Sequence, residues 1–185
     1  MADFTIAFDY LLKNEGGFVN NSSDPGGATK YGISFFFLRS QGNKYDFKNN
    51  GITVESIRSL TLDQAKEIYK DEFWDQLPYE EMSFQPIANY IFDTHVNIGQ
   101  GSTVRIIQRA LHAIGFTRTA IVEDGKMGNK TKNALISEMS ETQSAYQFKI
   151  VLKAIRAEYY YALVRLNPGN KKFIEGWLNR CYESI

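Results

Sequence analysis

The chain has 185 residues, with 21 basic and 21 acidic side chains, so its formal net charge at pH 7 is zero. This balance excludes the basic footprint expected of a nucleic-acid-binding protein or of one held on an anionic membrane. The single cysteine, Cys181, excludes an internal disulfide, and two widely separated histidines lead us to expect neither a metal nor a cofactor.

A first helix is predicted from apolar residues at helical spacing. Phe4, Phe8, Leu11 and Glu15 share one face, and the pair Gly16-Gly17 is expected to end the helix just after it. Glu15 then lies at the last turn on the apolar side. A carboxyl group in that place is expected to hold its proton near neutral pH, because desolvation disfavours the charged form.

A glycine-rich stretch follows, EGGFVNNSSDPGGATKYGIS over residues 15–34, with Asp24 nine residues after Glu15. Pro25 biases Asp24 towards an extended conformation, so residues 18–33 are predicted to form a loop or short hairpin. Glycines at this density indicate a backbone that a ligand approaches closely.

The remaining chain is predicted to be helical, and its helix starts are marked by capping residues. Thr61 and Gln64 have the spacing of a capping box, while Ser102 and Asn129 are predicted to cap later helices. A long helix with an apolar stripe over 148–163 is expected to end at 167–169. We therefore expect a mainly α (α+β) fold, with helices around a small glycine-rich loop or β-hairpin.

Glu15 and Asp24 suit the cleavage of a glycosidic bond. That reaction needs a protonated carboxylic acid for the leaving oxygen and a second carboxylate that activates water or stabilises the oxocarbenium-like transition state. Alternatively, Glu15 pairs with Lys13 or Lys30, and Asp24 only starts a turn. Spacing alone does not decide between these interpretations.

The motifs EGGF, DPGGATKYGIS and the segment around Trp74 resemble the glycoside hydrolase family 108 N-acetylmuramidases, an endolysin and secretion-activator family. The order Glu, Asp, Thr also resembles phage-type lysozymes, although Thr29 comes one position sooner. The resemblance implies a lysozyme-like fold with Glu15 as the catalytic acid. Asp24, Thr29 and Tyr31 are then candidates for activating or positioning water, and Tyr31 is also a candidate for binding the substrate.

The second half resembles the predicted peptidoglycan-binding region of the same family through FDTHVNIGQGSTVRIIQRAL, EDGKMGNKT and FIEGWLNRC. The family more commonly has Asn where this chain has Lys30. By this resemblance, residues 1–94 form the muramidase region and residues 95–185 the helical peptidoglycan-binding-like region, packed into one compact unit. The residues that match the second pattern are Asp93, Asn97, Gly99, Gln108, Asp124, Gly125, Gly128 and Thr131.

Further residues are candidates for binding the substrate. Trp74 and Tyr90 are predicted to stack on sugar rings, with a place in the core as the alternative. Asp93 and Asn97 lie one helical turn apart, and they either point into a cleft or stabilise a helix end.

The resemblance implies a hydrolase of the β-1,4 bond between N-acetylmuramic acid and N-acetylglucosamine, acting as a monomer on peptidoglycan glycan strands. A lytic transglycosylase and a non-catalytic wall-binding or secretion-assisting protein are the alternatives. From the first residues, Met-Ala-Asp-Phe-Thr, we expect no signal peptide, and from the lengths of the apolar runs we expect no membrane span. We expect synthesis in the cytoplasm and action in the periplasm or cell wall, after phage or prophage release through a holin or transport by a secretion system.

Overall fold

The computed structural model describes residues 1–13, 18–20, 27–116 and 120–182. The chain divides into two compact units. Phe4–Gln76 form the N-terminal unit, and Met1–Asp3 with Leu77–Ile185 form the C-terminal unit. The described elements are mostly helices, with one small antiparallel sheet, which confirms the predicted mainly α (α+β) class.

Aromatic side chains of the first helix of the N-terminal unit pack against the longest helix and against the 3-10 helix that follows it. Phe8 of α1 packs against Tyr69 of α4 at 5.7 Å between ring centroids, and Phe4 packs against Trp74 at 5.4 Å. Thr61 and Gln64 form both hydrogen bonds of the predicted capping box at the start of α4. The elements are α1 (Phe4–Leu12), β1 (Thr29–Lys30), β2 (Ile33–Ser34), α2 (Phe35–Ser40), α3 (Val54–Arg58), α4 (Leu62–Glu72) and the 3-10 helix η1 (Trp74–Gln76).

A tight hairpin confirms the predicted loop or hairpin near residue 30. Strands β1 and β2 pair Thr29 with Ser34 and Lys30 with Ile33, so the turn consists of Tyr31 and Gly32. Both turn residues have positive φ, 52° and 75°, as a two-residue type I′ turn requires. An isolated bridge between Val19 and Thr29 continues the pairing on the other side of β1.

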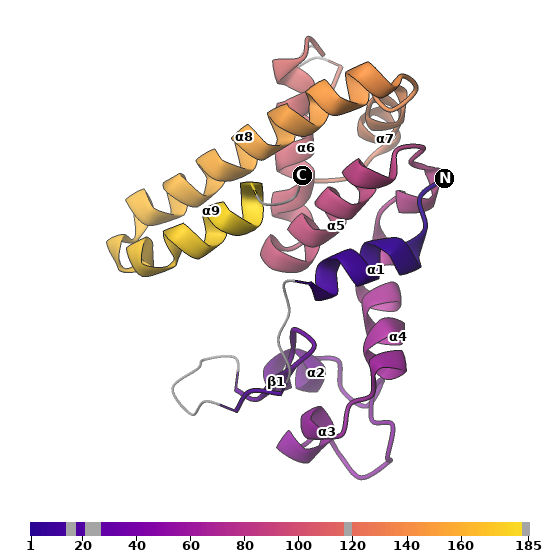
Figure 1. Ribbon diagram of the computed structural model, residues 1–185, viewed down its shortest axis with the longest axis vertical. Helices are drawn as coiled ribbons and strands as arrows, with labels where there is room; N and C mark the ends of the chain where they lie inside the picture. Colours follow the sequence, from indigo (N-terminus) through magenta and orange to yellow (C-terminus); the bar gives the residue numbers. More distant parts are fainter. Residues whose placement is uncertain (14–17, 21–26, 117–119, 183–185) are drawn as a thin grey trace. The chain divides into compact units, whose positions relative to one another are not determined.

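The C-terminal unit is built of packed helices (Figure 1). Helix α6 packs against α5 and α8, and α8 packs against α9. Figure 1 shows α8, in orange, and α9, in yellow, lying side by side. The elements are η2 (Tyr79–Glu81), α5 (Gln85–Ile98), α6 (Gln100–Ala113), α7 (Asn129–Ser137), α8 (Thr142–Leu166), η3 (Pro168–Phe173) and α9 (Ile174–Tyr182).

Two predicted helix caps are wrong by one or more residues. Ser102 lies inside α6, because Gly99, with φ of 79°, turns the chain within one residue and lets α6 begin at Gln100. Gly128 is the N-cap of α7, so Asn129 is its first helical residue. The predicted end of the long helix is confirmed, because α8 stops at Leu166, two residues before Pro168.

A buried histidine lies in the core of the C-terminal unit. His95 of α5 is 2% exposed, and its Nδ1 lies 3.1 Å from the hydroxyl of Tyr79, whose ring is stacked against the imidazole. Burial lowers the pKa of His95 from 6.5 to about 4. The folded protein therefore holds this side chain neutral at pH values where the unfolded chain binds a proton.

We expect this histidine to make the fold sensitive to acid. Between pH 6.5 and pH 4 the unfolded state binds the extra proton, so the free energy of unfolding should fall by about 3 kcal/mol as the pH is lowered through that range. Urea unfolding at a series of pH values measures this loss. The variant His95→Gln carries no titrating ring, and its stability should change less over the same range; an unchanged pH dependence would refute the assignment.

Candidate functional site

Both predicted catalytic carboxylates, Glu15 and Asp24, lie outside the described residues. Their roles stay predictions. Helix α1 buries Ala7, Phe8 and Leu11, which include Phe8 and Leu11 of the predicted apolar face. It ends at Leu12, so the predicted end of this helix at Gly16-Gly17, with Glu15 in the last turn, is too late.

Thr29 and Tyr31 come together on the hairpin. The backbone N–H and C=O of Thr29 bond to Val19 at 2.8 and 2.9 Å. A non-glycine residue with positive φ, such as Tyr31, is uncommon and strained, and it persists where its surroundings hold it. Here the hydroxyl of Tyr69 donates to the Tyr31 carbonyl at 2.9 Å. These contacts hold the hairpin, which forms the C-terminal end of the glycine-rich stretch, in place.

Lys30 has a structural role on the same hairpin. Its Nζ donates to the Arg58 carbonyl at 2.9 Å and lies 5.2 Å from the centre of the Tyr31 ring. The lysine thus ties β1 to the end of α3. Asn, which the resembled family more commonly has at this place, is too short for the same reach.

The predicted sugar stacking of Trp74 and Tyr90 does not agree with the structure. Each side chain is 1% exposed. A buried ring has no open face for a sugar, so both residues belong to the core, which was the alternative interpretation. Helical spacing is the same for core and groove aromatics, and burial distinguishes them.

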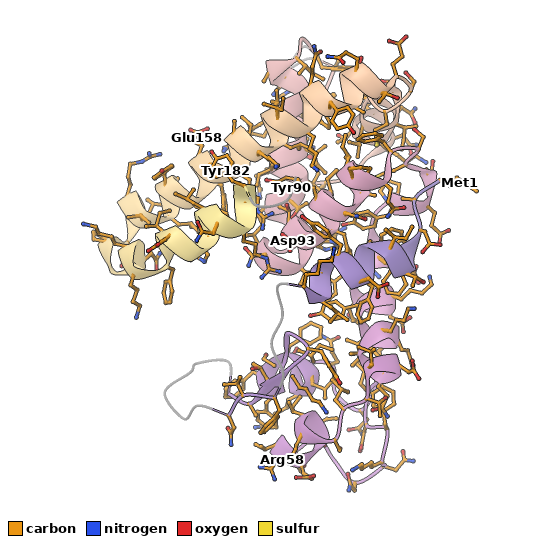
Figure 2. All side chains as sticks on the ribbon, viewed as in Figure 1. Met1, Arg58, Tyr90, Asp93, Glu158 and Tyr182 are labelled. Atoms are coloured by element: carbon orange, nitrogen blue, oxygen red, sulfur yellow. The ribbon has the colours of Figure 1, made fainter. Side chains whose placement is uncertain are left out.

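Asp93 lies at the centre of a buried charge cluster in the C-terminal unit (Figure 2). Its carboxylate accepts hydrogen bonds from Arg156 Nη1 of α8 and from Arg180 Nε of α9, both at 2.9 Å. The side chains of Asp93 and Arg156 are fully buried, and that of Arg180 is 19% exposed. The predicted contact of Asp93 with substrate is therefore wrong in this structure, since both carboxylate oxygens are engaged inside the protein.

The same cluster engages Asn97 and Tyr160. Arg156 Nε donates to the Tyr160 hydroxyl at 2.9 Å, and that hydroxyl donates to Asn97 Oδ1 at 2.6 Å. We call Asp93, Arg156, Arg180, Tyr160 and Asn97 the Asp93 cluster. It ties α5 to α8 and α9, so its described contacts support a structural role. Substrate binding by Asn97 stays a prediction.

Sequence reasoning missed Arg156 and Tyr160. The available signal was an arginine on the buried face of a long helix, four residues from both Leu152 and Tyr160. Isolated arginines are rarely buried without a partner, so such a position predicts a carboxylate elsewhere in the fold. Arg180 lies within the FIEGWLNRC segment that carries the resemblance. Its hydrogen bond to Asp93 gives the arginine of that segment a structural role.

A second polar centre holds the turn that carries EDGKMGNKT. Gln108 of α6 is 1% exposed, and its Nε2 donates to Asp124 Oδ1 at 2.9 Å and to the Lys126 carbonyl at 3.2 Å. Gln108 Oε1 accepts from the Gly125 N–H at 2.9 Å. The hydrogen bonds from Gln108 and from the Lys126 N–H lower the pKa of the Asp124 carboxyl. The turn is thus fixed against α6 just before α7.

Gly125 is required in this turn by both conformation and space. Its φ is 75°, and an added Cβ would lie 2.9 Å from the Gly101 carbonyl oxygen. We expect Gly125→Ala to lower the free energy of unfolding by about 1 to 3 kcal/mol. Gly128→Ala is the matched control, because nothing lies within 4 Å of its added Cβ. Thermal unfolding of both variants checks this, and equal losses would contradict the expected strain at Gly125.

Two further findings concern the described residues alone. No group of three or more His, Cys, Asp or Glu side chains there is placed to hold a metal ion. None of the described helices is both long and apolar enough to cross a membrane.

Two regions of the chain match known protein families. Residues 8–99 match glycosyl hydrolase 108, and residues 102–182 match a predicted peptidoglycan domain. The chain belongs to the glycosyl hydrolase 108 family. Its family makes it a glycosidase, and the two regions together make it a peptidoglycan hydrolase.

The fold is also that of a solved protein. The chain is similar to Brucella abortus SagA, with a TM-score of 0.72 and 23% sequence identity, over 98% of this chain and 90% of that chain. This likeness supports the lysozyme-like α+β fold. No match is found among curated proteins.

The family regions and the compact units divide the chain at different places. The family regions meet between residues 99 and 102, whereas the compact units meet between Gln76 and Leu77. Helix α5 therefore falls within the glycosyl hydrolase match and packs with the C-terminal helices. The predicted division into 1–94 and 95–185 stays a prediction.

Proposed function

We propose that the protein hydrolyses the β-1,4 bond between N-acetylmuramic acid and N-acetylglucosamine in peptidoglycan. The observation that carries this proposal is the glycosyl hydrolase 108 match over residues 8–99, which includes Glu15 and Asp24. The peptidoglycan domain over residues 102–182 supports the choice of polymer.

Glu15 is the proposed general acid, which protonates the leaving glycosidic oxygen. Asp24 is the proposed second carboxylate, which activates water or stabilises positive charge on the sugar. Thr29 is proposed to position the water, and Tyr31 to contact the sugar. The contacts of Tyr69 and Lys30 support this by fixing the hairpin on which Thr29 and Tyr31 lie.

Mass spectrometry of products from purified sacculi tests the bond and the reaction. We expect new reducing N-acetylmuramic acid ends that carry ¹⁸O when the digestion is done in H₂¹⁸O. Anhydro ends without ¹⁸O would indicate a lytic transglycosylase, and reducing N-acetylglucosamine ends would indicate cleavage of the other bond. Binding to sacculi without any new ends would indicate a non-catalytic wall-binding or secretion-assisting protein.

We further propose a route to the substrate, since peptidoglycan lies outside the cytoplasmic membrane. An enzyme made in the cytoplasm must cross this membrane to reach its substrate. In one route a phage or prophage holin releases the protein, which then acts as an endolysin and lyses the cell. In the other route a dedicated secretion system exports it. Expression with and without a holin tests this by the onset of lysis. Light scattering of the purified protein tests the expected monomer.

A further inference from the structure

The C-terminal unit has a groove beside the start of α7. It consists of two adjoining pockets, of about 350 and 500 Å³, which share Ala120, Ile121 and Lys130 in their walls. The turn held by Gln108 forms one end of the groove, and the exposed side of α7 forms one wall. We call this feature the α7 groove.

The lining of the α7 groove is apolar at its base. Ile121 and Ala134 are 2% and 7% exposed, and Phe116 lines the larger pocket beside them. Val122 lines the smaller pocket and is 65% exposed. The groove thus offers short aliphatic contacts, of the size that suits methyl groups.

Positive charge borders this apolar base. Lys126 and Lys130 line the groove, and both residues are exposed. Asp124 also lines it and stays ionised, because hydrogen bonds from Gln108 Nε2 and the Lys126 N–H lower its pKa, so its charge offsets that of one of the two lysines and leaves a positive excess. The neighbouring acid Glu123 is paired with Arg109 at 2.6 Å. The groove therefore favours an anionic ligand.

The chemistry of the lining distinguishes two parts of peptidoglycan. Glycan sites usually present an open aromatic face, and Phe116 is the only aromatic side chain among the described residues that line this groove. Stem peptides are rich in alanine and carry free carboxylates. Methyl groups match the base of the groove, carboxylates match its two lysines, and the amides of Asn129 and Asn133 are available to peptide groups.

We propose that the α7 groove binds the stem peptide of peptidoglycan and so holds the enzyme on cross-linked wall. This inference rests on the proposed function, because it assumes that the wall polymer is the substrate. It adds a binding site, formed mainly by Ile121, Lys126, Lys130 and Ala134, that is separate from the residues proposed for bond cleavage.

Calorimetry with a soluble stem peptide tests the proposal directly on the wild-type protein, because the peptide contains no glycosidic bond to cut. We expect binding, and at least a tenfold loss of affinity in the double variant Lys126→Glu/Lys130→Glu. The double variant Lys171→Glu/Lys172→Glu makes the same change of charge on η3 and should bind the peptide as the wild type does. An equal loss in both double variants would show non-specific attraction and overturn the proposal.

Sedimentation with sacculi then separates peptide from glycan recognition. The variant Glu15→Gln should pellet with intact sacculi and at least tenfold less with sacculi whose stem peptides an amidase has removed. Equal pelleting with both would assign the binding to the glycan strand and overturn the proposal. Since release of sugar ends is measured separately on the wild type, stem-peptide binding without any hydrolysis would refute the proposed reaction and leave the groove assignment standing.

Discussion

Replacing Asp93 with asparagine is expected to lower the free energy of unfolding by about 3 to 5 kcal/mol, because it leaves the buried guanidinium of Arg156 without a counter-charge. Arg156 is fully buried, and Asp93 is the acidic partner of its ion pair at 2.9 Å. The amide keeps the shape of the side chain and removes the charge, so the loss reports on electrostatics. Urea unfolding at neutral pH, followed by circular dichroism, measures it.

A matched pair on the surface provides the control. Glu123 faces Arg109 at 2.6 Å, with side chains 31% and 43% exposed, so Glu123→Gln removes the same charge from a hydrated ion pair. Its expected effect is about 1 kcal/mol or less. Adding Arg156→Met to Asp93→Asn should restore part of the stability, because no buried charge is then left unpaired. Similar losses for Asp93→Asn and Glu123→Gln would show that the cluster contributes little.

The features that were predictable from the sequence are those whose cause is local. The capping box of α4 joins residues three apart, and the end of α8 follows from the proline two residues beyond it. The hairpin followed from glycine and proline positions within one short stretch. Helix caps were less predictable, because a glycine with positive φ at residue 99 allowed α6 to start earlier than the serine indicated.

The Asp93 cluster was not predictable in the same way. Asp93 meets partners 63 and 87 residues further along the chain, and no local spacing encodes such contacts. A polar face on α5 is equally compatible with a ligand and with a buried ion pair. A ligand-binding aspartate and an aspartate in a buried ion pair have the same residue type and the same helical spacing. Only the packing of α8 and α9 around α5 distinguishes the two roles.

This cluster also shows why the boundary between the family regions is not a boundary between independent folding units. Asp93 and Asn97 fall within the glycosyl hydrolase match, whereas Arg156, Tyr160 and Arg180 fall within the peptidoglycan domain. A chain cut between residues 99 and 102 would leave both arginines without their carboxylate. The two regions therefore depend on each other through helix α5.

Replacing Glu15 with glutamine is expected to lower the rate of release of sugar ends from sacculi by about 10² to 10⁴-fold, the usual effect of removing a general acid. The amide keeps the size of the side chain but has no proton to donate to the leaving oxygen. Reducing-end assays on purified sacculi measure the rate. Glu55→Gln is the control, because this exposed carboxylate of α3 pairs only with Arg58 among the described residues and should leave the rate within about twofold.

The second carboxylate is separated from the first by comparing Asp24→Asn and Thr29→Val in the same assay. Removing a base that activates water should lower the rate about as much as removing the acid does. Removing a residue that only positions water should lower the rate less. A large loss in Asp24→Asn with a small loss in Thr29→Val supports two-carboxylate hydrolysis. A large loss in Thr29→Val with a small loss in Asp24→Asn would assign the positioning of water to Thr29 on the hairpin, where its backbone bonds to Val19. Full activity in Glu15→Gln would refute the proposed acid catalysis.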